Sequence, residues 1–216
     1  MSQILNIDAS HKARLFLSLF VPHKVHFLVL LFGALGVFSF APFFFSPVIL
    51  ISLMGLFFFW FNAKTPLDGF KLGLWFGFGF FGLGVSWLFS SMYFYSGVLL
   101  PVAMLLTFLF ILFLSLFIAI SGWLALHFRQ GYRSGFTLTV LFPAVWVLFE
   151  LLRASFLGGY PFLLLGNTHI DTWLAGYAPV LGVWGVNWAI AVSAGILLWL
   201  YQKRAWIRAS LALALL

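Results

Sequence analysis

The segment FELLRASFLGGYPFLLLGNTHID, residues 149–171, joins the end of an apolar helical pattern to a break rich in glycine. It contains Glu150, Arg153, His169 and Asp171, although only 7% of the chain is charged. The sequence Gly-Gly-Tyr-Pro stops a helix, and the run FLLL that follows it is too short to cross a bilayer. We therefore expect a helix end followed by a re-entrant or interfacial loop.

The rest of the chain has the composition of a membrane protein. Of its 216 residues, 64% are hydrophobic and 21% aromatic, and the mean hydropathy of +1.16 lies outside the range of soluble proteins. Apolar stretches of about 17 to 25 residues recur, each enough to cross a hydrocarbon core of about 30 Å. We predict an all-α, polytopic transmembrane helical bundle with six full spans and the start of a seventh at Ala209. The six spans are expected at about 25–41, 46–63, 70–94, 97–128, 135–152 and 176–201.

The two ends of the chain carry separate expectations. Residues 1–24 are expected to form a cytoplasmic or interfacial segment, with an amphipathic helix at 10–21, and residues 25–216 a transmembrane domain. Pro22 follows a short apolar run where a signal peptide would have a small-residue cleavage site, so no cleaved signal peptide is predicted. The sequence stops within the apolar run SLALALL, and we expect a truncated product.

The distribution of basic residues predicts the topology. A net charge of +7 can indicate nucleic-acid binding, but here the basic residues are scattered between apolar runs, which argues against nucleic acid. With strictly alternating connections, one side of the membrane carries Lys12, Arg14, Lys24, Lys64, Lys71, Arg129, Arg133, Lys203, Arg204 and Arg208. That side, and with it the N-terminus, should be cytoplasmic. Arg153 is the only basic residue expected on the outer side.

Glycines are frequent in the third predicted span. Gly69, Gly73 and Gly77 follow one another at four-residue spacing, which lets neighbouring helices approach closely. Close helix packing is the main interpretation, and a groove for a lipid tail beside these glycines is the alternative. Trp87 and Trp146 lie within predicted spans and are candidates for packing or for lipid contact.

Glu150 and Arg153 allow two interpretations. At positions i and i+3 of a helix they can form an ion pair that pins the helix end. Alternatively, Arg153 holds an anionic lipid head group, since a guanidinium matches phosphate geometry, and Glu150 orients it. The following loop would then line a cavity open to the outer leaflet. Its further candidate residues for lipid or substrate binding are Tyr160, Pro161, Gly166, His169 and Asp171.

Several kinds of catalytic site find no support. The chain has no cysteine, which excludes disulfides and a cysteine nucleophile. Ser155, His169 and Asp171 lack the nucleophile elbow of a hydrolase, so a solvated interfacial histidine beside a carboxylate is expected instead. The remaining histidines have no further ligands at a recognisable spacing, and phosphate-binding glycine loops are missing. We predict no metal and no cofactor.

The order of motifs resembles one known family. Pro143, Trp146, Glu150 and Arg153, followed by the Gly-Tyr-Pro of residues 159–161 and then by Gly166 and Asp171, resemble the membrane region of bacterial apolipoprotein N-acyltransferases. FSFAP at 38–42, ISLMGL at 51–56 and WFGFGFFGLGVSW at 75–87 add to the resemblance, which covers residues 26–208. The chain departs from the family pattern at Ser86, Phe162 and His169.

The resemblance implies a multi-pass enzyme of the bacterial inner membrane. Such an enzyme transfers an acyl chain from a phospholipid to the N-terminal diacylglyceryl-cysteine of a lipoprotein. In the family, a downstream nitrilase-like domain carries a Glu-Lys-Cys triad, so no catalytic residue is assigned to this chain and the chain alone is expected to be inactive. The alternative is a stand-alone membrane scaffold or transporter-like module without catalysis. Against the transporter, the sequence shows no internal repeat that matches the break in residues 158–166.

Overall fold

The protein is represented by a computed structural model that describes residues 22–214, with side chains for residues 24–176 and 178–203. The described part is all helical and contains no strand, as predicted. Its α-helices are α2 (Pro22–Gly36), α3 (Pro47–Asn62), α4 (Pro66–Gly84), α5 (Trp87–Ser90), α6 (Leu100–Phe128), α7 (Ser134–Phe136), α8 (Phe142–Ser155) and α9 (Ala178–Ala214). Shorter 3-10 helices are η1 (Val37–Ser39), η4 (Phe156–Gly158), η5 (Leu165–Thr168) and η6 (Trp173–Tyr177), and π-helices are η2 (Ser91–Tyr95) and η3 (Thr137–Leu141).

The prediction of six full spans is wrong for the described residues. Three helical stretches are long and apolar enough to cross a membrane, namely Leu100–Phe128, Ser134–Gly158 and Ala178–Lys203. A fourth span results if Pro66–Gly84 and Trp87–Tyr95, which meet at a 46° bend, count as one. The first two predicted spans correspond to shorter apolar helices. The 16 residues of α3 rise only about 24 Å, which is less than the hydrocarbon thickness of about 30 Å.

The expected start of a seventh span at Ala209 is also wrong, because α9 continues through that position to Ala214. The basic connection after residue 202 contains neither glycine nor proline. Lysine, arginine and alanine are good helix formers, so the polar residues extend the helix instead of ending it. The amphipathic helix expected at residues 10–21 lies outside the described residues.

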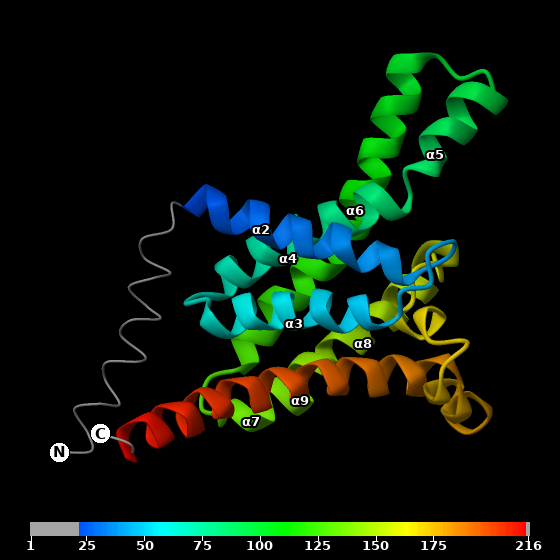
Figure 1. The fold of residues 1–216 in the computed structure, drawn as a ribbon. Coiled ribbons are helices and arrows are strands. Elements are labelled where there is room, and N and C mark those ends of the chain that lie inside the picture. Colours follow the sequence, from blue (N-terminus) through cyan, green and yellow to red (C-terminus); the bar gives the residue numbers. More distant parts are fainter. Residues whose placement is uncertain (1–21, 215–216) are drawn as a thin grey trace.

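Glycines bring α4 into close contact with helices on two sides. A Cβ atom on Gly69 or Gly73 would collide with the backbone carbonyl of Gly122 or Ile118 on α6. On another face of α4, a Cβ on Gly79 would collide with the carbonyl of Leu30 on α2. The packing interpretation of the glycine pattern is therefore confirmed. Figure 1 shows α4 in the middle of the molecule between these neighbours.

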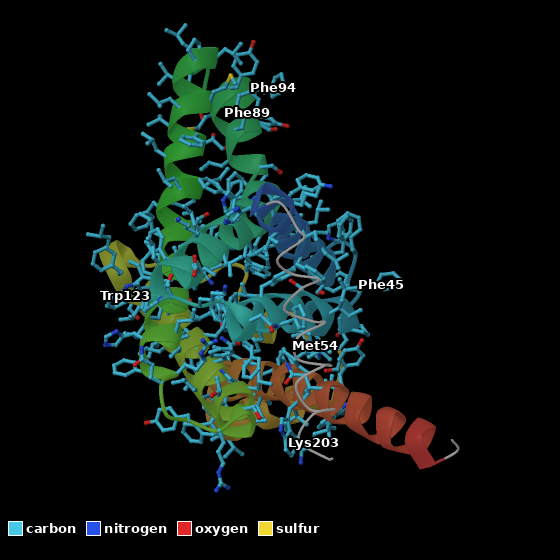
Figure 2. The ribbon with its side chains drawn as sticks, turned by 90° about the vertical axis from the view of Figure 1, so that its left-hand side faces the viewer. Phe45, Met54, Phe89, Phe94, Trp123 and Lys203 are labelled. Carbon is cyan, nitrogen blue, oxygen red and sulfur yellow. The ribbon has the colours of Figure 1, made fainter. Side chains whose placement is uncertain are left out.

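The chain turns at two opposite ends of the bundle. At one end, the α2–α3 connection lies near the yellow segment between α8 and α9 (Figure 1). The α3–α4 connection and α7 lie at the other end. The N-terminal half of α6 pairs with α5 and η2 in a hairpin that projects from the bundle. Figure 2 shows Phe89 and Phe94 on this hairpin, far from Lys203.

At the end that holds the α3–α4 connection, side chains satisfy the free ends of two helices. Arg129 Nη1 donates to the carbonyls of Trp60 (3.0 Å) and Phe61 (2.6 Å), and its Nη2 donates to the carbonyl of Ala63 (2.9 Å). Burial lowers the pKa of the Arg129 guanidinium from its usual value. The next helix, α4, begins with a capping box in which the residue preceding Pro66 exchanges hydrogen bonds with Asp68. Both devices replace backbone partners that helix termini lack.

Candidate functional site

The end of α8 carries a buried cluster of polar and aromatic side chains. Trp146, Glu150 and Arg153 follow one another at positions i, i+4 and i+7, so they lie on one face of the helix. Glu150 is 5% exposed and Arg153 is 4% exposed. Two charged groups this deeply buried require specific partners, because an unpaired buried charge is costly. Glu150 and Arg153 do not form the ion pair with each other that was one of the two interpretations. Their partners come from the loop that follows and from Asn187 of α9.

The loop between α8 and α9 leaves the helix through residues with left-handed backbone. Gly158 and Gly159 have φ angles of 90° and 78°, which glycine adopts without strain. A Cβ at Gly159 would also collide with the carbonyl of Ala154. Leu157 and Leu163 have φ angles of 52° and 55°, which are uncommon for a branched side chain. The predicted stop of the helix is confirmed, and the loop is irregular with three short 3-10 turns.

Arg153 binds the backbone of this loop. Its Nη1 donates to the carbonyl oxygens of Tyr160 (2.7 Å) and Phe162 (2.7 Å), and its Nη2 donates to that of Leu163 (3.4 Å). The guanidinium carbon also lies 5.3 Å from the ring centroid of Phe81 on α4. The flat guanidinium therefore satisfies three carbonyls that no helix or sheet satisfies.

Glu150 binds the next part of the loop together with Asn187 of α9. Glu150 Oε1 accepts a hydrogen bond from the amide of Leu165 (3.1 Å), and Oε2 accepts one from Asn187 Nδ2 (2.9 Å). Asn187 Oδ1 in turn accepts a hydrogen bond from the amide of Gly166 (2.6 Å). Gly166 has no room for a side chain, since a Cβ would lie 2.8 Å from this oxygen. Carbonyls and amides of the loop thus both have buried partners, as non-helical backbone at membrane depth requires.

Asn187 is a site residue that the sequence reasoning missed. It is fully buried and joins α8, α9 and the loop. A signal existed, because Asn187 is an uncharged polar residue within the apolar run LGVWGVNWAIAV. Polar residues within such segments usually bind one another or the backbone.

A small cavity lies behind the loop, between α4, α6 and α8. Phe81, Trp146, Glu150, Arg153 and Leu163 are among its lining residues. Its volume of about 10 Å³ is close to the space of one water molecule. A lipid head group does not fit there.

His169 is more buried than expected. Its side chain is 5% exposed, and Nδ1 lies 2.6 Å from Thr168 Oγ1. The Thr168 hydroxyl donates to the carbonyl of Leu165 (2.7 Å), so Nδ1–H of His169 donates to Thr168. Burial lowers the pKa of His169 from its usual value. The expectation of a solvated histidine is therefore wrong, whereas its neighbour Asp171 is exposed.

The remaining candidates lie at different places. Tyr160 is partly buried and meets Phe110 of α6 edge-on, with ring centroids 5.2 Å apart. Pro161 is exposed on the loop. Trp146 packs edge-on against Phe76. Trp87 is 54% exposed and is the first residue of α5, where the projecting hairpin begins.

The described residues show neither a hydrolytic triad nor a metal site. Ser155 Oγ donates to the carbonyl of Leu151 within its own helix (2.9 Å), and His169 has Thr168 as its partner. Among residues 22–214, which the structure describes, no group of three metal-binding side chains occurs.

The fold and the site define a helical membrane protein whose irregular loop is held by buried charged and polar side chains. The family model of the apolipoprotein N-acyltransferase N-terminal domain matches residues 32–196. The chain is 45% identical over 183 residues to the apolipoprotein N-acyltransferase of Methylococcus capsulatus. The aligned residues make up 84% of this chain and 36% of the relative. The enzyme of that name from Coxiella burnetii is 37% identical over 169 residues, covering 78% and 34%. The chain belongs to the apolipoprotein N-acyltransferase family and spans about a third of the length of these relatives.

Proposed function

We propose that residues 25–216 form the membrane-embedded part of an apolipoprotein N-acyltransferase. The complete enzyme would transfer a phospholipid acyl chain to the N-terminal diacylglyceryl-cysteine of lipoproteins. This part would anchor the enzyme and supply a lipid-facing surface at the loop after α8. The family match supports the proposal, and the loop held by Glu150, Arg153 and Asn187 is the observation that carries it.

The loop divides the candidate residues into two roles. Glu150, Arg153 and Gly166 are buried in the network that fixes the loop, and Trp146 packs behind it. In this proposal they position the loop, and Arg153 acts on lipid through it. Pro161, Asp171 and the partly buried Tyr160 would form its lipid-facing side, and the buried His169 would help to hold the loop. Trp87 would contact lipid from the hairpin.

The membrane orientation is part of the proposal. We place the enzyme in the bacterial inner membrane, with residues 1–24 and the N-terminus on the cytoplasmic side. Arg129 and Lys203 lie toward one end of the bundle and the loop of Arg153 toward the other, in agreement with the distribution of basic residues. The loop would then face the outer leaflet.

The chemistry would require groups outside these 216 residues, which contain no cysteine. Acyl transfer through a thioester needs an activated thiolate and a nearby base. We propose that a nitrilase-like domain supplies them, so the present chain alone should not transfer acyl groups.

A chimera tests the function. Residues 1–216 replace the corresponding region of the Methylococcus relative, and mass spectrometry measures N-acylation of a diacylated lipoprotein peptide in membranes. We expect activity from the chimera and none from residues 1–216 alone. The intact relative is the positive control. A chimera that inserts and folds but stays inactive would contradict the proposal and favour a stand-alone scaffold or transporter-like module.

A further inference from the structure

The glycine contact between α4 and α6 leaves a groove on the surface of the molecule, at the end opposite to the loop of Arg153. Gly69 and Gly122 meet through their backbones, as their missing side chains allow. The larger side chains beside this contact are Leu67 and Phe70 on α4 and Ile120 and Trp123 on α6, and they line a groove of about 330 Å³. The small size of Gly69 and Gly122 thus explains both the close contact of α4 with α6 and the groove beside it.

The groove is apolar and open. Leu67, Ile120 and Trp123 are exposed, and none of the described segments covers them. Figure 2 shows Trp123 on the outer side of α6. The volume lies at the lower end of the range of about 300 to 1,000 Å³ found for small-ligand pockets. It suits a stretch of one alkyl chain, and it is too small for a folded peptide segment.

Basic residues lie beside the groove. The His127 ring stacks on Trp123, with centroids 5.2 Å apart and an interplanar angle of 15°. Lys71 lies one helical turn after Leu67 on the same side of α4, and Lys64 precedes this helix. All three side chains are exposed. The nearby carboxylate, Asp68, already accepts the hydrogen bonds of the capping box, from the amide and hydroxyl of Thr65 (3.0 and 2.8 Å).

We propose that this groove binds an acyl chain of an anionic phospholipid, with the phosphate held by Lys71 and Lys64 and within reach of His127. An apolar groove beside exposed cations matches such a lipid at both of its ends. Long lysine side chains reach from apolar surface to the head-group region. The site goes beyond the proposed function, because it lies at the other end of the bundle from the loop and serves a lipid that is bound and not consumed.

The expected preference follows from the charges. Each lysine near an anionic membrane surface contributes about 1 kcal/mol, which corresponds to an enrichment of about fivefold. A zwitterionic lipid can fill the groove with its chain but does not gain this preference. Anionic lipid should therefore occupy the groove at a lower fraction of the membrane than zwitterionic lipid.

Fluorescence of Trp123 tests the site in the full 216-residue chain in lipid nanodiscs. Brominated acyl chains of phosphatidylglycerol or phosphatidylcholine serve as quenchers, and the difference between the parent and Trp123→Phe isolates the signal of Trp123. We expect half-maximal quenching at a mole fraction of phosphatidylglycerol about 25-fold lower than that of phosphatidylcholine, because each of the two lysines contributes about fivefold.

Two charge variants complete the test, each measured with and without Trp123→Phe. Lys71→Gln should lower the preference for the anionic lipid to about fivefold, the contribution of Lys64, and leave quenching by phosphatidylcholine unchanged. Lys203→Gln, on α9 and away from the groove, should keep the preference. Equal quenching by both lipids, or an unchanged preference in Lys71→Gln, would overturn the proposal. Because the readout needs no acyl transfer, it is independent of the chimera experiment.

Discussion

Two arginines at opposite ends of the bundle bind backbone carbonyls in the same way but in different surroundings. Arg129 donates to the last carbonyls of α3, which any helix leaves free at its C-terminus. Arg153 donates to three carbonyls of an irregular loop. Arg129 acts alone, whereas the loop also needs Glu150 and Asn187 for its amides.

The difference shows what an irregular loop requires inside an apolar bundle. A helix end exposes groups of one polarity, so a single cation satisfies it. The loop exposes both carbonyls and amides, and therefore needs a cation, a carboxylate and an amide side chain together. Three side chains must therefore act together to hold the loop, whereas one side chain is sufficient at the end of α3.

The largest effect is expected for Arg153→Met. The change removes three hydrogen bonds and leaves the loop carbonyls of Tyr160, Phe162 and Leu163 without this partner, at a cost of about 1 to 3 kcal/mol for each buried group. The midpoint of thermal unfolding in detergent should fall further than in Asn187→Leu or Arg129→Met. A fall no greater than that of Arg129→Met would contradict the proposed network.

Asn187→Leu should have the next largest effect. It leaves the Gly166 amide and Glu150 Oε2 without this partner, at a cost of about 1 to 3 kcal/mol. Hydrogen exchange should speed up at Gly166. Ser193→Ala is the matched control, because Ser193 lies on the same helix and only donates to its own turn; its stability should change by about 0.5 kcal/mol or less. Similar losses in both variants would show that Asn187 has no special role.

Arg129→Met is expected to cost less, about 1 kcal/mol, since the carbonyls at the end of α3 can turn to water at the surface. Exchange should increase near Ala63 and stay unchanged in residues 156–169. If the loop responded as well, the two arginine sites would be coupled, and the comparison of independent ends would fail.

The smallest effect concerns pH and His169. Because burial lowers the pKa of His169, the folded state favours the neutral ring. The neutral His169 ring should contribute fully to stability above pH 6.5, the usual pKa of histidine. This contribution should be lost as the pH falls below 6.5 toward the lowered pKa. The thermal midpoint should therefore drop less between pH 7.5 and 5.5 in His169→Gln than in the parent. Equal drops would exclude this role.

The sequence predicted the end of α8 correctly, whereas it predicted the number of membrane spans wrongly. Gly158, Gly159 and Pro161 marked the end of α8 correctly, because helix breakers act through neighbouring residues. The partners of Arg153 and Glu150 could not be read from the sequence. Asn187 lies 37 residues after Glu150, and the positive φ angle of Leu163 depends on the folded loop.

The span count failed for a different reason. Hydropathy reports composition and not helix length, so the short helices α2 and α3 looked like full spans. The basic residues from Lys203 onward looked like a connection although they continue α9. The close packing of α4 was predictable because glycine spacing directly determines how near two helices can approach.

The most direct test of the account measures acyl loading of the chimera from phospholipid, per folded molecule, in Arg153→Lys and Arg129→Lys. Lysine keeps the charge but cannot reproduce the guanidinium geometry. Because the loop would be misplaced, loading should fall about 10- to 100-fold in Arg153→Lys, and it should stay close to the parent value in Arg129→Lys. Unchanged loading in Arg153→Lys, or equal loss in both variants, would contradict the claim that Arg153 positions the lipid-facing loop.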